Sequence, residues 1–171
     1  MSSSAITIRP VAAGDLDVCY AIEAACYGPE GATRERIERR IASYPQGFLV
    51  AELDGPIAGF INSGATHRDD IGDEAFKDMV GHEEDGRNIV VFSLAVRPQS
   101  QGRGISRQLM ERFIEVSGQL RKENILLLCQ TELIAYYQKY GFVHRGPSSS
   151  DHGGLRWHEM RLNLNLDRTR Q

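Results

Sequence analysis

Apolar and polar positions alternate along the chain with two periods, one typical of strands and one typical of helices. Compact apolar runs bounded by glycine, proline or aspartate predict strands at residues 6–9, 48–53, 57–65, 88–96, 125–129, 142–145 and 157–164. Apolar residues at intervals of three or four predict helices at residues 15–26, 34–43, 105–118 and 133–140. This order of elements predicts an α/β domain with a mixed sheet that ends in a hairpin.

Three local patterns support these boundaries. Asp15 can cap the first helix, because a side-chain oxygen at the N-cap accepts a hydrogen bond from the first turn. The pair Asp54-Gly55 between two apolar runs predicts a tight hairpin. The run 88–96 is almost continuously apolar, as expected of a strand buried on both faces. The apolar face of the first helix is expected to hold Val18, Cys19, Ile22 and Cys26.

The chain has 171 residues, of which 41% are hydrophobic and 25% charged, and its net charge is −3. These values predict one globular domain over residues 1–171 with an ordered core at about 5–164, and they exclude disorder as a description of the whole chain. No apolar run approaches the ~20 residues of a membrane-spanning helix, and the first residues lack a secretory signal. Three cysteines do not form a disulfide framework. We therefore expect a cytoplasmic protein with no membrane partner and with reduced cysteines.

Charge is distributed unevenly. Residues 69–85 hold eight acidic side chains against Lys77, a balance of −7, and residues 97–122 hold six basic side chains against two acidic ones, a balance of +4. Two interpretations stay open: both segments are solvated faces, or they form a site with one end for an anion and one for a cation. The acidic overall balance and the lack of interleaved basic and aromatic residues argue against a nucleic-acid partner.

The segment 90–106 joins a buried strand to an amphipathic helix through the turn Gly102-Arg103-Gly104. Such a turn presents backbone N–H groups and the positive end of the helix dipole to an anion, and glycine lets a phosphate approach closely. Arg103 and Arg107 add positive charge. No G-K-[S/T] follows, so the segment is not a P-loop, and it lacks the third glycine of a dinucleotide fingerprint. The pattern predicts phosphate binding, with a plain connecting turn as the alternative.

The same segment resembles the acetyl-coenzyme A signature of the GNAT N-acetyltransferases, Q/R-x-x-G-x-G/A, with Ser106 in place of the final small residue. A second stretch, at residues 127–142, resembles the later motif of that family and ends in Y-x-x-x-G-F. The resemblance covers residues 5–164 and is closest to the serotonin (arylalkylamine) N-acetyltransferase branch. It implies a mixed, mostly antiparallel central sheet flanked by helices, with a splayed strand pair at the acetyl-CoA site.

The resemblance also implies roles for individual residues. Tyr137 would lie beside the cofactor sulfur and act as general acid. Because a tyrosine hydroxyl is a weaker acid than a thiol, full proton transfer to the leaving thiolate is uphill by ~2 kcal/mol, so Tyr137 is expected to assist rather than to be indispensable. Tyr136 and Tyr140 share one helix face and are expected to be structural. Leu94, Ala95 and Val96 would pair with the pantetheine arm, and Gln101, Gly102, Arg103, Gly104, Ile105 and Ser106 would hold the pyrophosphate.

The base that removes the proton of the amine is not fixed by the resemblance. The vertebrate enzymes of the arylalkylamine branch carry two histidines on the strand before the signature, but Val90 and Phe92 occupy those positions here. An aliphatic amine is almost fully protonated at pH 7, so binding its neutral form costs ~4–5 kcal/mol unless the site takes the proton. Glu30, in the loop after the first helix, is the preferred base, with Glu52 and water-linked carboxylates as the alternatives. His144 and His158 are assigned to the terminal strands, and no cluster with metal-ligand spacing is found, so no metal is expected.

Together these features predict an acetyl-CoA-dependent N-acetyltransferase that acts on a primary amine by direct attack in a ternary complex. Its expected substrate is a small arylalkylamine or polyamine. Two alternatives stay open: an acetyltransferase for protein lysines or N-termini, and a non-catalytic acyl-CoA-binding module. The sequence leaves open which amine is used and whether the protein is a monomer or a homodimer.

Overall fold

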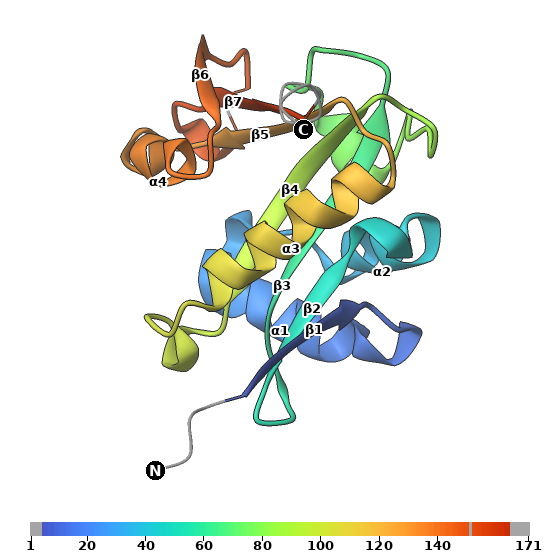
Figure 1. Cartoon of the computed structure of the whole chain (residues 1–171), viewed down its shortest axis with the longest axis vertical. Helices are drawn as coiled ribbons and strands as arrows, with labels where there is room; N and C mark the ends of the chain where they lie inside the picture. The colour runs from blue at the N-terminus through green and yellow to red at the C-terminus, as the bar shows by residue number, and fades with distance from the viewer. Residues whose placement is uncertain (1–4, 151, 165–171) are drawn as a thin grey trace. The chain divides into compact units, whose positions relative to one another are not determined.

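The computed structural model describes residues 5–150 and 152–164 of the chain (Figure 1). Every helix and strand predicted from the sequence is present, with ends that differ from the prediction by no more than two residues. The strands are β1 (Ile6–Pro10), β2 (Leu49–Leu53), β3 (Ile57–Thr66), β4 (Asn88–Val96), β5 (Asn124–Cys129), β6 (Val143–Pro147) and β7 (His158–Asn163). The helices are α1 (Leu16–Tyr27), α2 (Arg34–Ser43), α3 (Ile105–Gln119) and α4 (Ile134–Gln138).

The seven strands hydrogen-bond in the order β1-β2-β3-β4-β5-β7-β6. The pair β4–β5 is parallel, whereas β1–β2, β2–β3, β5–β7 and β6–β7 are antiparallel. The prediction of a mixed, mostly antiparallel sheet flanked by helices is therefore confirmed. The chain divides into two compact units, Met1–Ser63 with Ser93–Phe113 and Gly64–Phe92 with Ile114–Gln171. The cuts fall within β3, β4 and α3, so these three elements contribute residues to both units.

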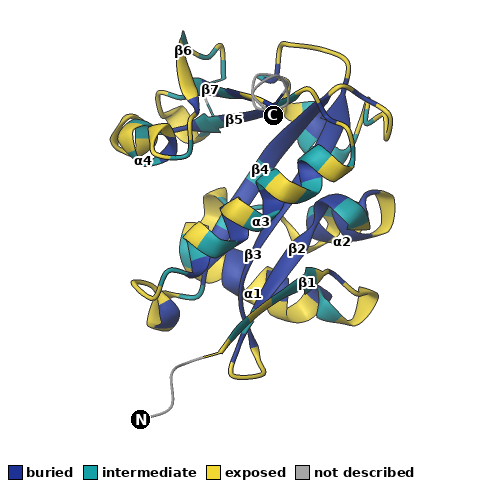
Figure 2. Ribbon diagram, viewed as in Figure 1, coloured by how far each residue is buried: buried dark blue, intermediate teal, exposed yellow. Residues whose placement is uncertain are grey.

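In the first unit, β1, β2 and the first part of β3 form an antiparallel meander. Asp54 and Gly55 have φ angles of 54° and 115°, so both central residues of the β2–β3 turn are left-handed, as a type I′ turn requires. The rings of Phe48 and Phe60 lie 5.6 Å apart in the core under the meander. Figure 2 shows β2, β3 and β4 buried over most of their length, in agreement with their apolar sequences.

The first helix differs from the prediction in two details. Asp15 precedes α1, but its carboxylate does not cap the helix; it accepts a hydrogen bond from the Ala12 N–H at 2.8 Å and pairs with Arg9 at 2.8 Å. The hydrogen bond from Arg9 lowers the pKa of Asp15. Val18 is 36% exposed and lies outside the apolar face. The buried residues of the helix are Leu16, Cys19, Ile22 and an acidic residue, Glu23.

In the second unit, β4 and β5 pair from Asn88 with Asn124 to Val91 with Leu127, and the ladder ends there. Phe92 packs with its ring centroid 5.2 Å from that of Phe76. Val90 lies in the same cluster, with Ile71, Phe76 and Leu126. The two positions at which the resemblance lacks histidines are thus filled by packing residues.

Lys122, one of the six basic side chains of residues 97–122, is buried. Its side chain is 3% exposed, and its ammonium donates hydrogen bonds of 2.7 Å to the carbonyl oxygens of Glu84 and Gly86. Burial lowers the pKa of this ammonium. Gly86 in turn lies so close to Thr66 that an added Cβ would be 2.4 Å from the Thr66 nitrogen. The loop before β4 is therefore held by the hydrogen bonds from Lys122 and by the close approach of Gly86 to Thr66.

The acidic segment 69–85 is mostly loop, with a short 3-10 helix at Glu74–Asp78. Much of its charge is paired within the second unit. Asp69 pairs with Arg87 at 3.1 Å and with Arg161 at 3.5 Å, and Glu74 pairs with Lys77 at 3.0 Å. The hydrogen bond from Arg87 lowers the pKa of Asp69. These pairs support the interpretation of the segment as a solvated face.

The cysteines are free, as predicted. Cys19 and Cys129 are buried, and burial raises the pKa of Cys19 to about 12 and that of Cys129 to about 11, so both remain thiols at neutral pH. Among the described residues, no helix combines the length and the apolar character needed to cross a membrane.

Candidate functional site

The turn between β4 and α3 combines a short 3-10 helix with two glycines. After Pro98–Ser100, Gly102 and Gly104 each have a φ of 81°, a left-handed conformation in which other residues are strained. Arg97 stabilises the start of the turn, because its guanidinium donates to Ser100 Oγ at 3.1 Å. The glycines predicted from the sequence are therefore required by the backbone itself.

The turn leads directly into the first turn of α3. The Gln108 N–H donates to the Gly104 carbonyl at 3.1 Å, so the N–H groups of Ile105, Ser106 and Arg107 precede the first intrahelical bond. Such N–H groups and the helix dipole favour an anion. Ile105 is 1% exposed, so its side chain belongs to the core and only its backbone is available. Arg103 and Arg107 are exposed.

The backbone of β4 presents alternate residues to opposite edges. The Arg97 N–H donates to the Ala58 carbonyl of β3 at 2.7 Å, so the polar groups of Ala95, two residues earlier, also face β3. Gly59 on β3 approaches this strand so closely that an added Cβ would be 2.8 Å from the Ala95 oxygen. Leu94 and Val96 therefore present their N–H and C=O groups to the edge that faces away from β3.

Side chains from α1 and the turn bind the carbonyls on that edge. The hydroxyl of Tyr27 donates to the Leu94 carbonyl at 2.7 Å. The Val96 carbonyl accepts from Gln101 Nε2 at 3.0 Å and from Cys26 Sγ at 3.2 Å. Burial raises the pKa of the Tyr27 hydroxyl and of the Cys26 thiol, so both keep the protons that they donate. Gln101, predicted to hold the pyrophosphate, directs its side-chain amide to the strand and braces the turn.

Glu23 is a residue that the sequence reasoning missed. Its side chain is 2% exposed, and Oε2 accepts hydrogen bonds from the Ala32 N–H at 2.8 Å and from Ser93 Oγ at 3.3 Å. The other carboxylate oxygen, Oε1, is buried without a hydrogen-bond partner among the described residues. Glu23 thus links the loop after α1 to β4. The available signal was its position between Ile22 and Cys26 in an otherwise apolar stripe, because a lone acid on a buried helix face needs specific donors.

The two carboxylates predicted as bases lie in different surroundings. Glu30 is exposed, at the end of the short 3-10 helix Gly28–Glu30. Glu52 lies on β2, half-buried, with Oε2 3.5 Å from Arg9 Nε. Glu30 lies in the segment that follows α1, whereas Glu52 is paired with the guanidinium of Arg9.

Tyr137 belongs to the second unit. It lies on α4 and is 8% exposed, with its ring centroid 5.0 Å from that of Tyr136 and 5.9 Å from that of Phe142. The hydroxyls of Tyr136 and Tyr140 are 2.9 Å apart, which confirms that these two residues share a face. Tyr137 therefore has a fixed ring orientation, because aromatic neighbours contact it in edge-to-face geometry.

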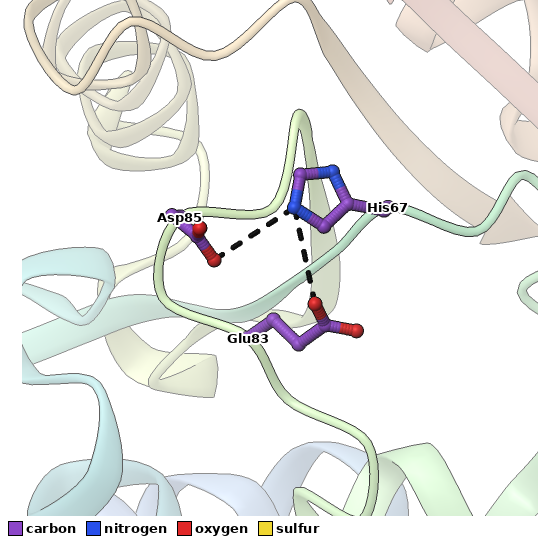
Figure 3. A group of neighbouring side chains, drawn as sticks. All are labelled: His67, Glu83 and Asp85. Carbon is purple, nitrogen blue, oxygen red and sulfur yellow. Dashed lines mark ion pairs between the residues drawn. The ribbon is translucent and has the colours of Figure 1, made fainter.

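One group of side chains in the described part of the chain has the composition of a metal site. Nε2 of His67 lies 3.8 Å from Glu83 and 3.7 Å from Asp85 (Figure 3). All three residues are exposed, and Asp85 exposes 89% of its side chain. The ammonium of Lys122 is bound to the carbonyls on either side of Asp85, which adds a positive charge to the same loop. We interpret His67, Glu83 and Asp85 as a cluster of ion pairs on the surface.

A model of the acetyltransferase (GNAT) family matches residues 16–142. A probable glucosamine 6-phosphate N-acetyltransferase 2 from Oryza sativa subsp. japonica is 39% identical over 67 residues, which is 39% of this chain and 36% of that protein. The chain spans between about a third and a half of the length of the curated relatives that it matches.

Solved structures share the fold along almost the whole chain. The loading GNATL domain of CurA from Lyngbya majuscula has a TM-score of 0.84 at 17% identity, with 95% of this chain and 99% of that domain covered. The structure of yncA from Salmonella typhimurium with its cofactor acetyl-CoA has a TM-score of 0.67 at 21% identity, with 93% and 94% covered. At these identities the likeness shows the fold.

We predict that Glu23 controls the order of the loop after α1. Replacing Glu23 by Ala removes the acceptor of the Ala32 N–H, so amide exchange at Ala32 should accelerate by at least ~10-fold, which corresponds to ~1.4 kcal/mol of local protection. Hydrogen exchange read by NMR or mass spectrometry measures this. Glu38→Ala, an exposed position on α2, is the matched control and should leave the exchange at Ala32 unchanged. Equal exchange in Glu23→Ala and wild type would refute the role.

Proposed function

The chain belongs to the acetyltransferase (GNAT) family, and we propose that it transfers the acetyl group of acetyl-CoA to a primary amine of a small molecule, an arylalkylamine or a polyamine. The reaction is direct attack of the amine in a ternary complex. The observation that supports the cofactor is the left-handed glycine turn at the start of α3, because it combines close backbone approach with the N-terminal end of a helix. The family match supports the acetyl group.

In this proposal the turn holds the pyrophosphate of acetyl-CoA. The backbone of Gly102 to Ser106 supplies donors, and Arg103 supplies positive charge. Gln101 contributes by fixing the turn against Val96. The pantetheine arm extends along the free edge of β4, where the carbonyls of Leu94 and Val96 already have donors and their N–H groups point the same way. Ala95 lies between them and keeps the strand paired with β3.

The chemistry requires a neutral amine and a protonated leaving group. Tyr137 is the proposed general acid for the departing thiolate, supported by its place in the motif that ends at Gly141-Phe142 and by its fixed ring. Glu30 is the proposed acceptor of the proton of the amine, supported by its exposed position in the loop after α1. A positioned acid or base typically contributes between ~10² and ~10⁴ in rate.

A panel of amines tests the proposed function. Phenethylamine, tryptamine, spermidine, glucosamine 6-phosphate and a lysine peptide are each offered with acetyl-CoA, and thiol release is measured. We expect release with phenethylamine, tryptamine or spermidine at a rate at least ~10-fold above the lysine peptide, a difference of ~1.4 kcal/mol in activation free energy. Preference for the lysine peptide would replace the small amine by a protein acceptor. Absence of release with every amine would leave an acyl-CoA-binding module.

Gly104→Glu tests the phosphate-binding turn. The new carboxylate would lie where the pyrophosphate is proposed to bind, so affinity for acetyl-CoA should fall by more than ~10-fold, or ~1.4 kcal/mol, with the fold retained. Gly104→Ala is the matched control, because it shares the backbone strain at φ 81° without the charge. Calorimetry measures both. Equal affinity in Gly104→Glu and wild type would refute the phosphate-binding turn.

Tyr137→Phe tests the general acid. The ring and its packing remain, and only the hydroxyl is lost. We expect kcat to fall by between ~10-fold and ~10³-fold, with little change in affinity for acetyl-CoA, and the alkaline limb of the pH–rate profile to move or vanish. Tyr136→Phe is the control on the same helix. A wild-type kcat across pH 6–10, the range to be scanned, would remove Tyr137 from the mechanism.

A further inference from the structure

The ion pairs of His67 have an unusual geometry. Figure 3 shows the carboxylates of Glu83 and Asp85 directed at the same ring nitrogen, and Nε2 of His67 lies 3.8 Å from Glu83 Oε2 and 3.7 Å from Asp85 Oδ1. Both distances are too long for a hydrogen bond. All three atoms lie within 4.8 Å of one another. This spacing fits groups arranged around a bound ion better than it fits hydrogen-bonded partners.

Hydrogen bonds of the backbone bring the imidazole and the carboxylates together within the second unit. β3 ends at Thr66, so His67 directly follows the strand. The Glu83 N–H donates to the Ala65 carbonyl at 2.9 Å, and the Ala65 N–H donates to Nδ1 of His82 at 3.0 Å. These two bonds hold residues 82 and 83 beside the end of β3.

The part of the loop that carries Asp85 is held as well. The Gly86 N–H donates to the Glu83 carbonyl at 2.8 Å, which closes a turn with Asp85 inside it. The ammonium of Lys122 donates to the carbonyls of Glu84 and Gly86 at 2.7 Å each. These bonds use the backbone of the loop, so the carboxylates of Glu83 and Asp85 remain available to a ligand.

The loop carries an excess of negative charge. Residues 83–85 are all acidic, and Lys122 is bound to the same loop, so three carboxylates and one ammonium give a balance of −2. Arg68 is paired with Asp73 at 3.3 Å. Among the residues that the structure describes, the ion pairs of both Glu83 and Asp85 are with His67. When the imidazole is unprotonated, as a metal ligand must be, the two carboxylates favour a cation.

We propose that His67, Glu83 and Asp85 bind a divalent transition-metal ion, and that this ion is Zn²⁺. Zinc accepts imidazole nitrogen together with carboxylate oxygen, whereas Mg²⁺ and Ca²⁺ take oxygen ligands. Bonds of ~2.0–2.2 Å to a tetrahedral zinc place its ligand atoms ~3.4 Å apart, only slightly closer than the nitrogen–oxygen distances here. Without the ion, the same atoms form the surface ion pairs described above.

The exposure of the side chains lets them complete the coordination. Glu83 and Asp85 expose 53% and 89% of their side chains, so both can turn to bring their oxygens to the spacing that zinc requires. Three protein ligands leave the fourth position of the tetrahedron to water.

The proposed site joins segments that are distant along the chain. Spacing along the sequence predicted no metal, because His67 lies 16 residues before Glu83 and outside the short motifs of metal sites. A bound ion links the end of β3 to the loop before β4. It should therefore stabilise this part of the second unit, because an ion that binds the folded state favours that state.

Calorimetric titration with ZnCl₂ tests the site, on full-length protein freed of metal by a chelator and dialysis. We expect saturable binding of Zn²⁺ to the wild type and at least ~10-fold weaker binding of Mg²⁺. His67→Ala and Asp85→Ala each remove one ligand and should weaken zinc binding by at least ~10-fold. Both positions are exposed, so the variants keep the fold. Zinc should raise the Tm of the wild type and leave that of both variants unchanged.

His144→Ala is the matched control. Nε2 of His144 lies 3.0 Å from Nδ1 of His158, so this pair of rings is the competing place for zinc in the described part of the chain. The control should bind zinc as tightly as the wild type. Wild-type affinity in His67→Ala or Asp85→Ala, loss of binding in His144→Ala, or a wild-type protein that binds no zinc would each overturn the proposed site. Equal affinity for Mg²⁺ and Zn²⁺ would overturn the role of the imidazole as a ligand.

Discussion

The polar groups of a strand alternate between its two edges, and β4 uses both edges for different purposes. Ala95 and Arg97 face β3, so the strand cannot rotate without losing its place in the sheet. Leu94 and Val96 then necessarily face the other way. Tyr27 and Cys26 reach their carbonyls from α1, and Gln101 does so from the turn. One strand therefore fixes the position of a helix, of the glycine turn and of the first N–H groups of α3.

Much of the fold followed from patterns that act over short distances. The boundaries of β4 and α2 were predicted to the residue, because an apolar run and a charged amphipathic stretch each end at a clear change of composition. The glycine turn before α3 was also predicted from its local sequence, and its left-handed φ angles were found only in the structure. Features that depend on distant partners were not predicted: Asp15 binds Arg9 instead of its helix, and Lys122 is buried because two carbonyls of a remote loop accept its hydrogen bonds.

The candidate site shows the same contrast between features set by local sequence and features set by distant partners. The turn and Tyr137 were identified from local motifs, but Glu23 was not identified. Its partners, Ala32 and Ser93, lie nine and seventy residues away along the chain. The contact between His144 and His158 depends on the register of two terminal strands and on a bulge between His144 and Gly146, which no pattern within either strand specifies.

The division of the chain into two units has a consequence for its synthesis. Each unit is assembled from two separate stretches, and the first one needs Ser93–Phe113 to complete its sheet and its helix layer. A ribosome that has released only the first 63 residues has therefore exposed β1, β2 and most of β3 without the strand and the helix that cover them. Because such non-local pairings close late, the nascent chain carries an open sheet edge for a large part of translation.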